Sequence, residues 1–161
     1  MKTYSIQLLL LALLLAGCKT EPKNFNLLFK MESLGAYKVW LEINSDKSYS
    51  IKQQDLVFDG HAKKTRLNKA QGVLTDEEFA KFTDLLTHSP LLKMKDAYGF
   101  DEDSPNDPFV GLIYYLTYTE GSKTKYISLQ PKPNISFPGK FSQLINFLIN
   151  YSSDHLEKEQ D

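Results

Sequence analysis

The sequence predicts an α+β domain in which a mostly antiparallel sheet of about five strands is packed by two amphipathic helices. Strand patterns linked by hairpin turns stand both before and after the first helix pattern, and strands joined by hairpins cannot form a parallel βαβ winding. Two segments with apolar residues at helical spacing supply the helices. The ten Phe and nine Tyr residues of the 161-residue chain favour a strand-rich core.

The N-terminal strands are predicted from alternating apolar residues. Residues 25–31 carry an apolar side chain at every second position, and residues 37–44 alternate apolar and polar side chains as a half-buried strand does. After a short polar turn, residues 49–54 begin a returning strand, which makes a hairpin. Residues 59–71 carry five basic side chains, counting one histidine, and little periodicity. We interpret them as a solvated strand or loop.

The first helix is predicted from the residues at its two ends. Thr75 and Glu78 have the spacing of a capping box, in which the two residues satisfy each other's backbone donors. Apolar residues then recur on one face. The helix should end near His88, because Pro90 disfavours helical geometry in the residue before it.

The C-terminal half contains the longest loop, two strands and the second helix. The loop at residues 96–108 has five acidic residues and three Gly or Pro breakers. Residues 109–119 have apolar and aromatic side chains at both sets of alternating positions, which predicts a strand covered on two sides. A turn at Gly121 leads to a returning strand at residues 125–129. Residues 138–151 then show the spacing of an amphipathic helix, opened by a proline.

The first 17 residues have the parts of an export signal: a positive Lys2, an apolar stretch and small residues at the end. The stretch is shorter than the roughly 20 apolar residues that span a bilayer as a helix. Its last residues and the following cysteine resemble the lipobox of bacterial lipoproteins: Leu15-Ala16-Gly17-Cys18. The resemblance implies cleavage before Cys18 and attachment of lipid to its sulfur.

These signals divide the chain into four parts. Residues 1–17 are the signal peptide, which is removed, and residues 18–24 are the lipidated cysteine and a linker. Residues 25–152 form a single α+β domain, and residues 153–161 are a charged tail. Extended at about 3.3 Å per residue, the linker spans on the order of 20 Å and keeps the domain close to the membrane surface.

Cysteine use and charge exclude several classes of function. Cys18 is the only cysteine, so its lipidation leaves no thiol for disulfides, Cys-based zinc sites or a cysteine nucleophile. The chain has 19 basic and 20 acidic side chains. With acidic and basic residues so nearly equal in number, the chain is not expected to have the basic surface of a nucleic-acid-binding protein or a polybasic patch for anionic lipid.

A second resemblance concerns the domain itself. It is carried by the run Gly72-Val73-Leu74-Thr75-Asp76-Glu77-Glu78-Phe79, the acidic loop closing on Asp107-Pro108, the strand after it and the proline-started last helix. Together these features resemble a family of small bacterial lipoproteins whose domain has no assigned function. The resemblance covers most of residues 39–152. It implies the architecture given above and no reaction.

The acidic loop is a candidate calcium site. Asp101, Asp103 and Asp107 place hard oxygen ligands within seven residues, and Ca²⁺ takes six to eight oxygen ligands. The loop lacks an EF-hand pattern, since Pro105 and Asn106 stand where that motif needs an oxygen ligand and a glycine. The alternative is a solvated loop of turn-forming residues. No other metal ligands, no cofactor and no catalytic residue are predicted.

Two features are candidate interaction sites. Trp40 falls on the polar side of its strand, where an exposed aromatic residue is typical of interaction hot spots. The alternative is that a helix covers this side and Trp40 belongs to the core. Lys63, Lys64 and Arg66 lie in the densest basic cluster, which could meet an acidic partner or lipid headgroups; the alternative is a solvated strand or loop.

The sequence favours one functional hypothesis over two others. The first is a lipid-anchored lipoprotein of the cell envelope that acts as a non-catalytic interaction or accessory module. Its partners are the membrane, through the N-terminal lipid, and an envelope protein or glycan, with no nucleic acid. The second is an envelope hydrolase or a sugar- or peptide-handling enzyme with a site near Asp96–Asp107. The third is an inhibitor of a secreted enzyme, held at the surface and using the strand that bears Trp40.

The residue after the lipidated cysteine indicates the membrane. Lys19 stands at this position, and by the sorting rule of double-membrane bacteria a residue other than aspartate implies the outer membrane. The sequence leaves open whether the domain faces the periplasm or the cell exterior.

Overall fold

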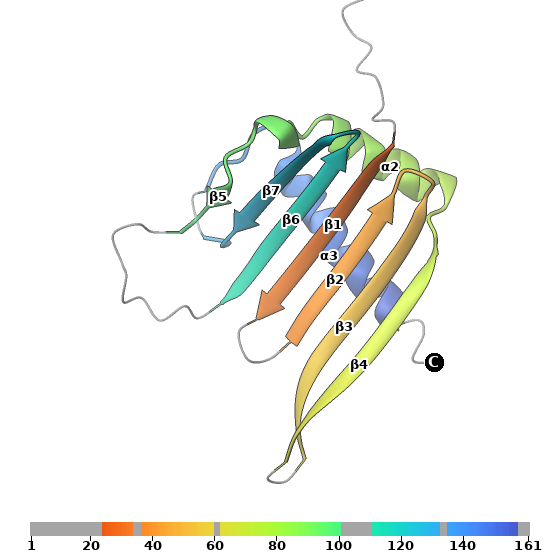
Figure 1. Cartoon of the computed structure of the whole chain (residues 1–161), viewed down its shortest axis with the longest axis vertical. Helices are drawn as coiled ribbons and strands as arrows, with labels where there is room; N and C mark the ends of the chain where they lie inside the picture. Colours follow the sequence, from red (N-terminus) through yellow and green to blue (C-terminus); the bar gives the residue numbers. More distant parts are fainter. Residues whose placement is uncertain (1–23, 34–36, 60–61, 101–110, 133–134, 158–161) are drawn as a thin grey trace, which may run out of the picture.

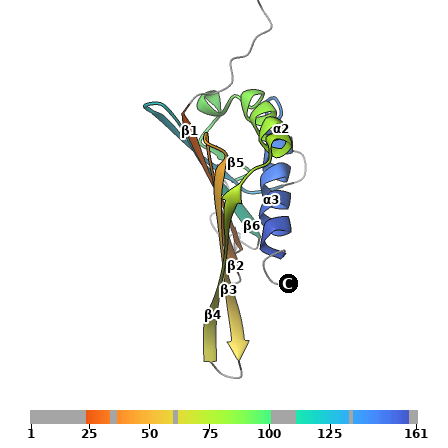
Figure 2. The same cartoon turned by 90° about the vertical axis from the view of Figure 1, so that its right-hand side faces the viewer.

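A computed structural model describes residues 24–33, 37–59, 62–100, 111–132 and 135–157. They form one seven-stranded sheet in the order β4-β3-β2-β1-β6-β7-β5, with two helices on the same face (Figures 1 and 2). The elements are β1 (Phe25–Ser33), β2 (Tyr37–Asn44), β3 (Ser48–Asp59), β4 (Ala62–Val73), α2 (Asp76–Thr87), a 3₁₀ turn η1 (Leu91–Lys93), β5 (Ala97–Tyr98), β6 (Leu112–Glu120), β7 (Lys123–Leu129) and α3 (Phe141–Glu157).

The α+β class, the mostly antiparallel sheet and the two helices are confirmed, but the strand count is wrong. The two additional strands are β4, which pairs with β3 along its whole length, and β5, a two-residue strand parallel to β7. β4 is an edge strand, with a neighbour on one side only. Edge strands commonly carry charged side chains, so β4 lacks the alternation by which strands are found.

The core lies between the sheet and the helices. It is built from the alternate residues of β1 and β2 that the sequence assigns to one face, among them Phe29 and Leu41, neither of which has any exposed surface. From the helices, Phe82 and Phe141 are equally buried. Packing this face against two amphipathic helices removes the apolar side of every central strand from water.

The capping box of α2 is confirmed. The Thr75 hydroxyl accepts a hydrogen bond from the backbone N–H of Glu78 at 3.2 Å, and the Glu78 carboxylate accepts one from the backbone N–H of Thr75 at 2.8 Å. The helix ends at Thr87, with His88 as its C-terminal cap. The two ends of α2 are thus set by local residues, as expected.

α3 starts later and ends later than the sequence predicts. It begins at Phe141, since Gly139 has a positive φ of 60° and the backbone N–H of Lys140 donates to the carbonyl of His88 at 3.1 Å. It continues past residue 151 to Glu157, into the segment assigned to the charged tail. Leu156 is only 5% exposed, so its burial extends the apolar face by one turn.

β6 is less covered than expected. Leu116 and Tyr118 are buried toward the helices, whereas Tyr115 and Thr117, which point to the other face, are half-buried. Among the described residues, no helix packs on that second face (Figure 2). On that face Ile113 is buried at 9% exposure, so the expected burial on both sides is observed at Ile113 but not at Tyr115 and Thr117; residues 109–110 lie outside the described part of the chain.

Candidate interaction surface

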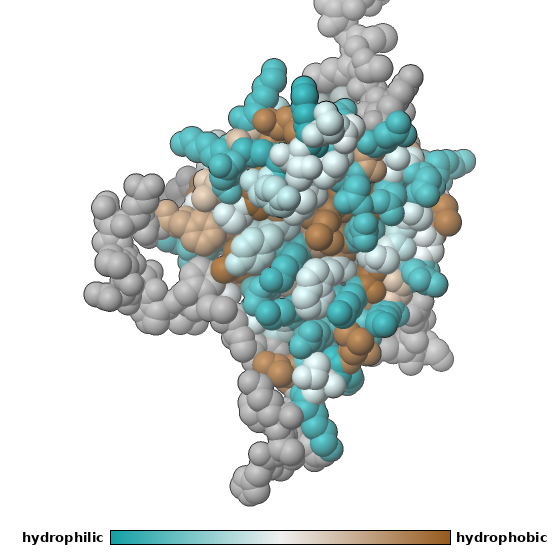
Figure 3. Space-filling model, viewed as in Figure 1, coloured by the Kyte–Doolittle hydropathy of each residue, from teal (hydrophilic) through white to brown (hydrophobic). Residues whose placement is uncertain are grey.

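The face of the sheet opposite α2 and α3, here called the open face, is the front of the molecule in Figure 1. No described helix or loop covers it. Figure 3 shows mostly hydrophilic and intermediate side chains on this face, with small separate hydrophobic patches. A face of this kind is not a continuous apolar surface, so any binding here must use specific aromatic and charged groups.

Strand register aligns six of these side chains in one row that crosses the sheet at right angles to the strands. Residues that lie directly opposite each other on neighbouring strands share a face. The opposite pairs run in an unbroken series from β7 to β4. The row, in order, is Ser128, Tyr115, Lys30, Trp40, Lys52 and Lys69.

Aromatic rings and ammonium groups alternate in the middle of this row. The Lys30 Nζ lies 4.9 Å from the centre of the Tyr115 ring, and the Lys52 Nζ lies 5.1 Å from the Trp40 ring. Both distances are within the range of cation–π attraction. Trp40 and Tyr115 are half-buried, so their rings are held by their neighbours and still reach solvent.

The carboxylates of the open face already have partners. Glu32 contacts Lys30 at 2.5 Å and Lys38 at 2.7 Å, and hydrogen bonds from these two ammonium groups hold the pKa of Glu32 below its usual value. Glu42 accepts a hydrogen bond from the Asn26 side chain at 2.6 Å.

Lys52 and Lys69 differ from the other cations of this face. They are directly opposite each other and exposed, and within the described chain neither contacts a carboxylate. Like charges directly opposite across strands destabilise a sheet.

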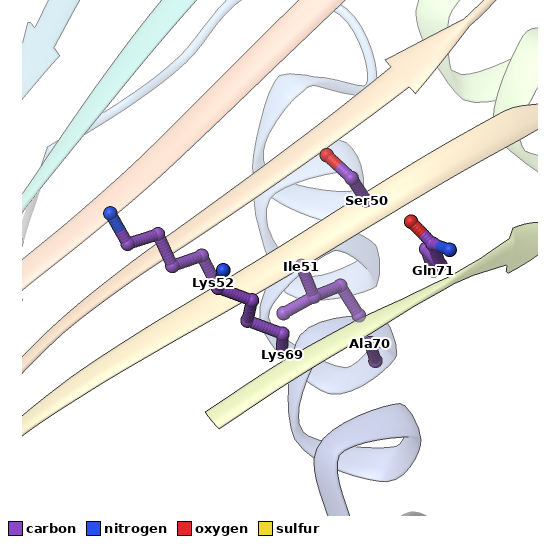
Figure 4. A pocket seen from close by; sticks show the side chains of 6 residues that line it. All are labelled: Ser50, Ile51, Lys52, Lys69, Ala70 and Gln71. Carbon is purple, nitrogen blue, oxygen red and sulfur yellow. The ribbon is translucent and has the colours of Figure 1, made fainter. Parts of the chain in front are cut away.

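Two shallow hollows lie at the ends of the row. One, of about 470 Å³, is lined by Lys52 and Lys69 with Ser50 and Gln71 beside them. Figure 4 shows both lysine side chains extending in the same direction, toward β2. The other hollow, of about 520 Å³, lies over β6 and β7 and includes Tyr115 and Ser128, together with side chains from the edge of the sheet.

The structure does not bring the predicted interaction residues together. Trp40 lies on the open face, as its position in the strand predicts. Arg66 is opposite Asp55 and Lys64 is two residues away on the same strand, so both lie on the helix side. The side chain of Lys63 is outside the described part of the structure. Trp40 and the two basic residues Lys64 and Arg66 therefore lie on opposite faces of the sheet.

Arg66 lines a separate cleft of about 360 Å³ at the end of α3. Its guanidinium is 3.5 Å from the carboxylate of Asp55. Asn68 borders the same cleft, and its buried side-chain N–H₂ has no hydrogen-bond partner among the described residues. The β3–β4 hairpin projects beyond α3 at this end, as Figure 2 shows.

The proposed calcium ligands Asp101, Asp103 and Asp107 lie outside the described residues, so the structure does not test them. Asp96, at the start of the same loop, contacts the ammonium group of Lys125. Within the described ranges, no group of three or more His, Cys, Asp and Glu side chains could hold a metal ion.

The two described histidines have local partners. His88 contacts the Asp84 carbonyl at 2.8 Å, and His155 stacks on Tyr151 with ring centres 3.9 Å apart. His88 is the C-terminal cap of α2, and His155 lies in the last turn of α3.

β2 is an interior strand, paired with β1 on one side and β3 on the other. Its backbone groups are thus used within the sheet, and it offers a partner only side chains such as Trp40. An inhibitor that docks by adding the backbone of this strand to an enzyme is inconsistent with that position.

Sequence reasoning identified Trp40 but missed Lys30, Lys52, Lys69 and Tyr115. Lys30, Lys52 and Tyr115 stand at positions that alternation assigns to the open side of their strands. Lys69 falls in β4, a segment that the sequence predicts only as a solvated strand or loop. Their common signal is the register between strands, which pairs residues far apart in the sequence.

The described residues define an α+β domain whose sheet is covered by helices on one face. A comparison with known families and with curated proteins finds no family model and no protein that matches this chain. Within the described residues, no helix is long and apolar enough to cross a membrane.

Proposed function

We propose that this chain is a lipid-anchored, non-catalytic binding module of the cell envelope that engages its partner with the open face of its sheet. The observation that carries the proposal is the strand-crossing row of aromatic and cationic side chains around Trp40. Half-exposed Trp and Tyr rings flanked by charged groups are enriched among residues that dominate binding energy.

The anchor follows from the lipobox at Cys18. Lipid on this cysteine and a linker of about 20 Å confine the partner to the vicinity of the membrane surface. With Lys19 after the cysteine, the membrane is the outer membrane. An anchored domain meets its partner at high local concentration, so a shallow binding face of moderate affinity is sufficient.

The anchor is tested by mass spectrometry of the mature N-terminus. We expect residues 1–17 to be absent and the sulfur of Cys18 to carry a diacylglyceryl group. A Cys18→Ala variant should keep residues 1–17, because the processing enzyme requires the lipidated cysteine. An unmodified Cys18, or a wild-type chain that still begins at Met1, would contradict the anchor.

The binding face is tested by crosslinking the full-length protein in isolated envelope. Partner crosslinks should map to β1, β2, β3 and β6, and Trp40→Ala should weaken capture by at least about 2 kcal/mol, roughly thirtyfold in affinity. Capture is measured by titration and the crosslinked positions by peptide mass spectrometry.

Leu92→Ala is the matched control, since Leu92 is an exposed apolar residue in η1, outside the sheet. It should capture the partner like the wild type, and circular dichroism should show that both variants are folded at the temperature of the assay. Crosslinks concentrated on α2 and α3, or equal capture by the two variants, would overturn the proposal.

A further inference from the structure

The row on the open face has the repeat distance of a saccharide chain. Neighbouring strands lie about 4.8 Å apart, so the five steps from Ser128 to Lys69 span roughly 24 Å. That step is close to the length of one hexose unit in an extended polysaccharide. A glycan crossing the strands would therefore place one sugar unit over each strand.

The chemistry along the row matches an acidic glycan. The flat faces of the Trp40 and Tyr115 rings can pack against the C–H faces of sugar rings, while their polar edges stay hydrated. Lys30 and Lys52 stand beside these rings. The row contains three lysines and no carboxylate, on a chain whose formal net charge is −1. Lys30 is already paired with Glu32, so the unbalanced positive charge of the row lies at Lys52 and Lys69.

The unbalanced positive charge of the row is greatest at its β4 end. Lys52 and Lys69 oppose each other directly, with no carboxylate between them among the described side chains. A carboxylate placed in the hollow between them would relieve their repulsion and accept charge-assisted hydrogen bonds. The hydroxyl of Ser50 and the amide of Gln71 line the same hollow and can bind sugar hydroxyls (Figure 4).

From this arrangement we infer that the partner of the open face is an acidic polysaccharide, a statement that rests on the function proposed above. Its chain crosses the strands from the hollow at Tyr115 to the hollow at Lys69. A sugar ring packs on Trp40, and a uronate carboxylate lies between Lys52 and Lys69.

An extended acidic peptide fits the row less well. It advances about 3.3 Å per residue and presents side chains to one face only at every second residue. The spacing of its charged side chains therefore differs from the spacing of neighbouring strands.

The test measures binding of a uronic-acid hexasaccharide to the full-length protein in detergent, by calorimetry. A neutral hexasaccharide of the same linkage, a polyglutamate peptide and an oligothymidylate of equal charge are compared with it. We expect the uronate to bind most tightly and its affinity to fall with added salt, because exposed charges are screened. Lys52→Gln with Lys69→Gln should weaken uronate binding about tenfold, the effect of losing charged hydrogen bonds.

The control is Lys81→Gln with Lys93→Gln, which removes the same charge from α2 and η1, outside the sheet. It should leave uronate binding unchanged. The Lys52 and Lys69 variant should melt close to the wild type without ligand, since the lost repulsion between the two lysines offsets the lost attraction of Lys52 to the Trp40 ring.

Three results would overturn the inference: equal binding of the neutral hexasaccharide, equal effects of the two double variants, or tighter binding of polyglutamate or oligothymidylate. If envelope crosslinks still map to the open face when the uronate fails to bind, the polysaccharide is wrong and the binding face stands. If crosslinks map elsewhere, the proposed function itself fails.

Discussion

Replacing Phe82 with alanine is expected to lower the free energy of unfolding by about 3–5 kcal/mol, the usual range for a fully buried aromatic residue. Phe82 has no exposed surface. Its ring centre lies 5.9 Å from that of Phe25 in β1 and 5.8 Å from that of Phe147 in α3. The side chain thus joins α2, the sheet and α3, and its loss opens a cavity among three elements. Urea denaturation followed by circular dichroism measures the change.

Tyr126→Ala is the matched control, because Tyr126 is 67% exposed on the open face of β7. Its removal should change stability by no more than about 0.5 kcal/mol. Phe82→Leu should lose less than Phe82→Ala, since leucine keeps part of the volume. Comparable losses for Phe82→Ala and Tyr126→Ala would show that the aromatic cluster does not carry the packing of α2.

Gly139→Ala is expected to cost at least about 3 kcal/mol, with two contributions of different origin. Gly139 has φ of +60°, a conformation that costs an L-residue about 1–2 kcal/mol. A Cβ at this position would also lie 2.1 Å from the carbonyl oxygen of His88. That oxygen is fixed by its hydrogen bond from Lys140, so the junction between α2 and α3 would have to move. Thermal and urea denaturation report the loss.

Gly121→Ala separates the two contributions. Gly121 has nearly the same φ, +58°, but no atom lies within 4 Å of the Cβ that alanine would add. It should therefore lose only the backbone contribution of about 1–2 kcal/mol. The difference between the two variants measures the contact with His88. Equal losses would mean that the start of α3 adjusts freely, contrary to the packing described above.

The elements that the sequence predicts well are those with local causes. Thr75 and Glu78 cap α2 through bonds between residues three apart, and Gly121 supports the β6–β7 turn by its own backbone freedom. Both features are complete within a few residues, so tertiary packing is not needed to find them.

The elements that the sequence misses depend on distant partners. β4 carries Lys, Arg or Asn at five of its twelve positions and becomes a strand only because β3 offers a full set of backbone donors and acceptors. The last turn of α3 includes charged residues. It stays helical because Leu156 finds a buried position in the core.

The candidate surface is likewise predicted in part from local sequence pattern and in part only from the tertiary structure. The sequence by itself determined that residues alternate between two sides of each strand, and hence that Trp40 stands on the polar side of β2. The tertiary structure decided that this side has no helix over it in the described chain, and that Lys30, Lys52 and Lys69 lie in line with the tryptophan. Alternation is a property of one strand, whereas the row depends on the register of several strands. That register is fixed by packing the opposite face against α2 and α3, because a slip of one residue would turn every core side chain outward.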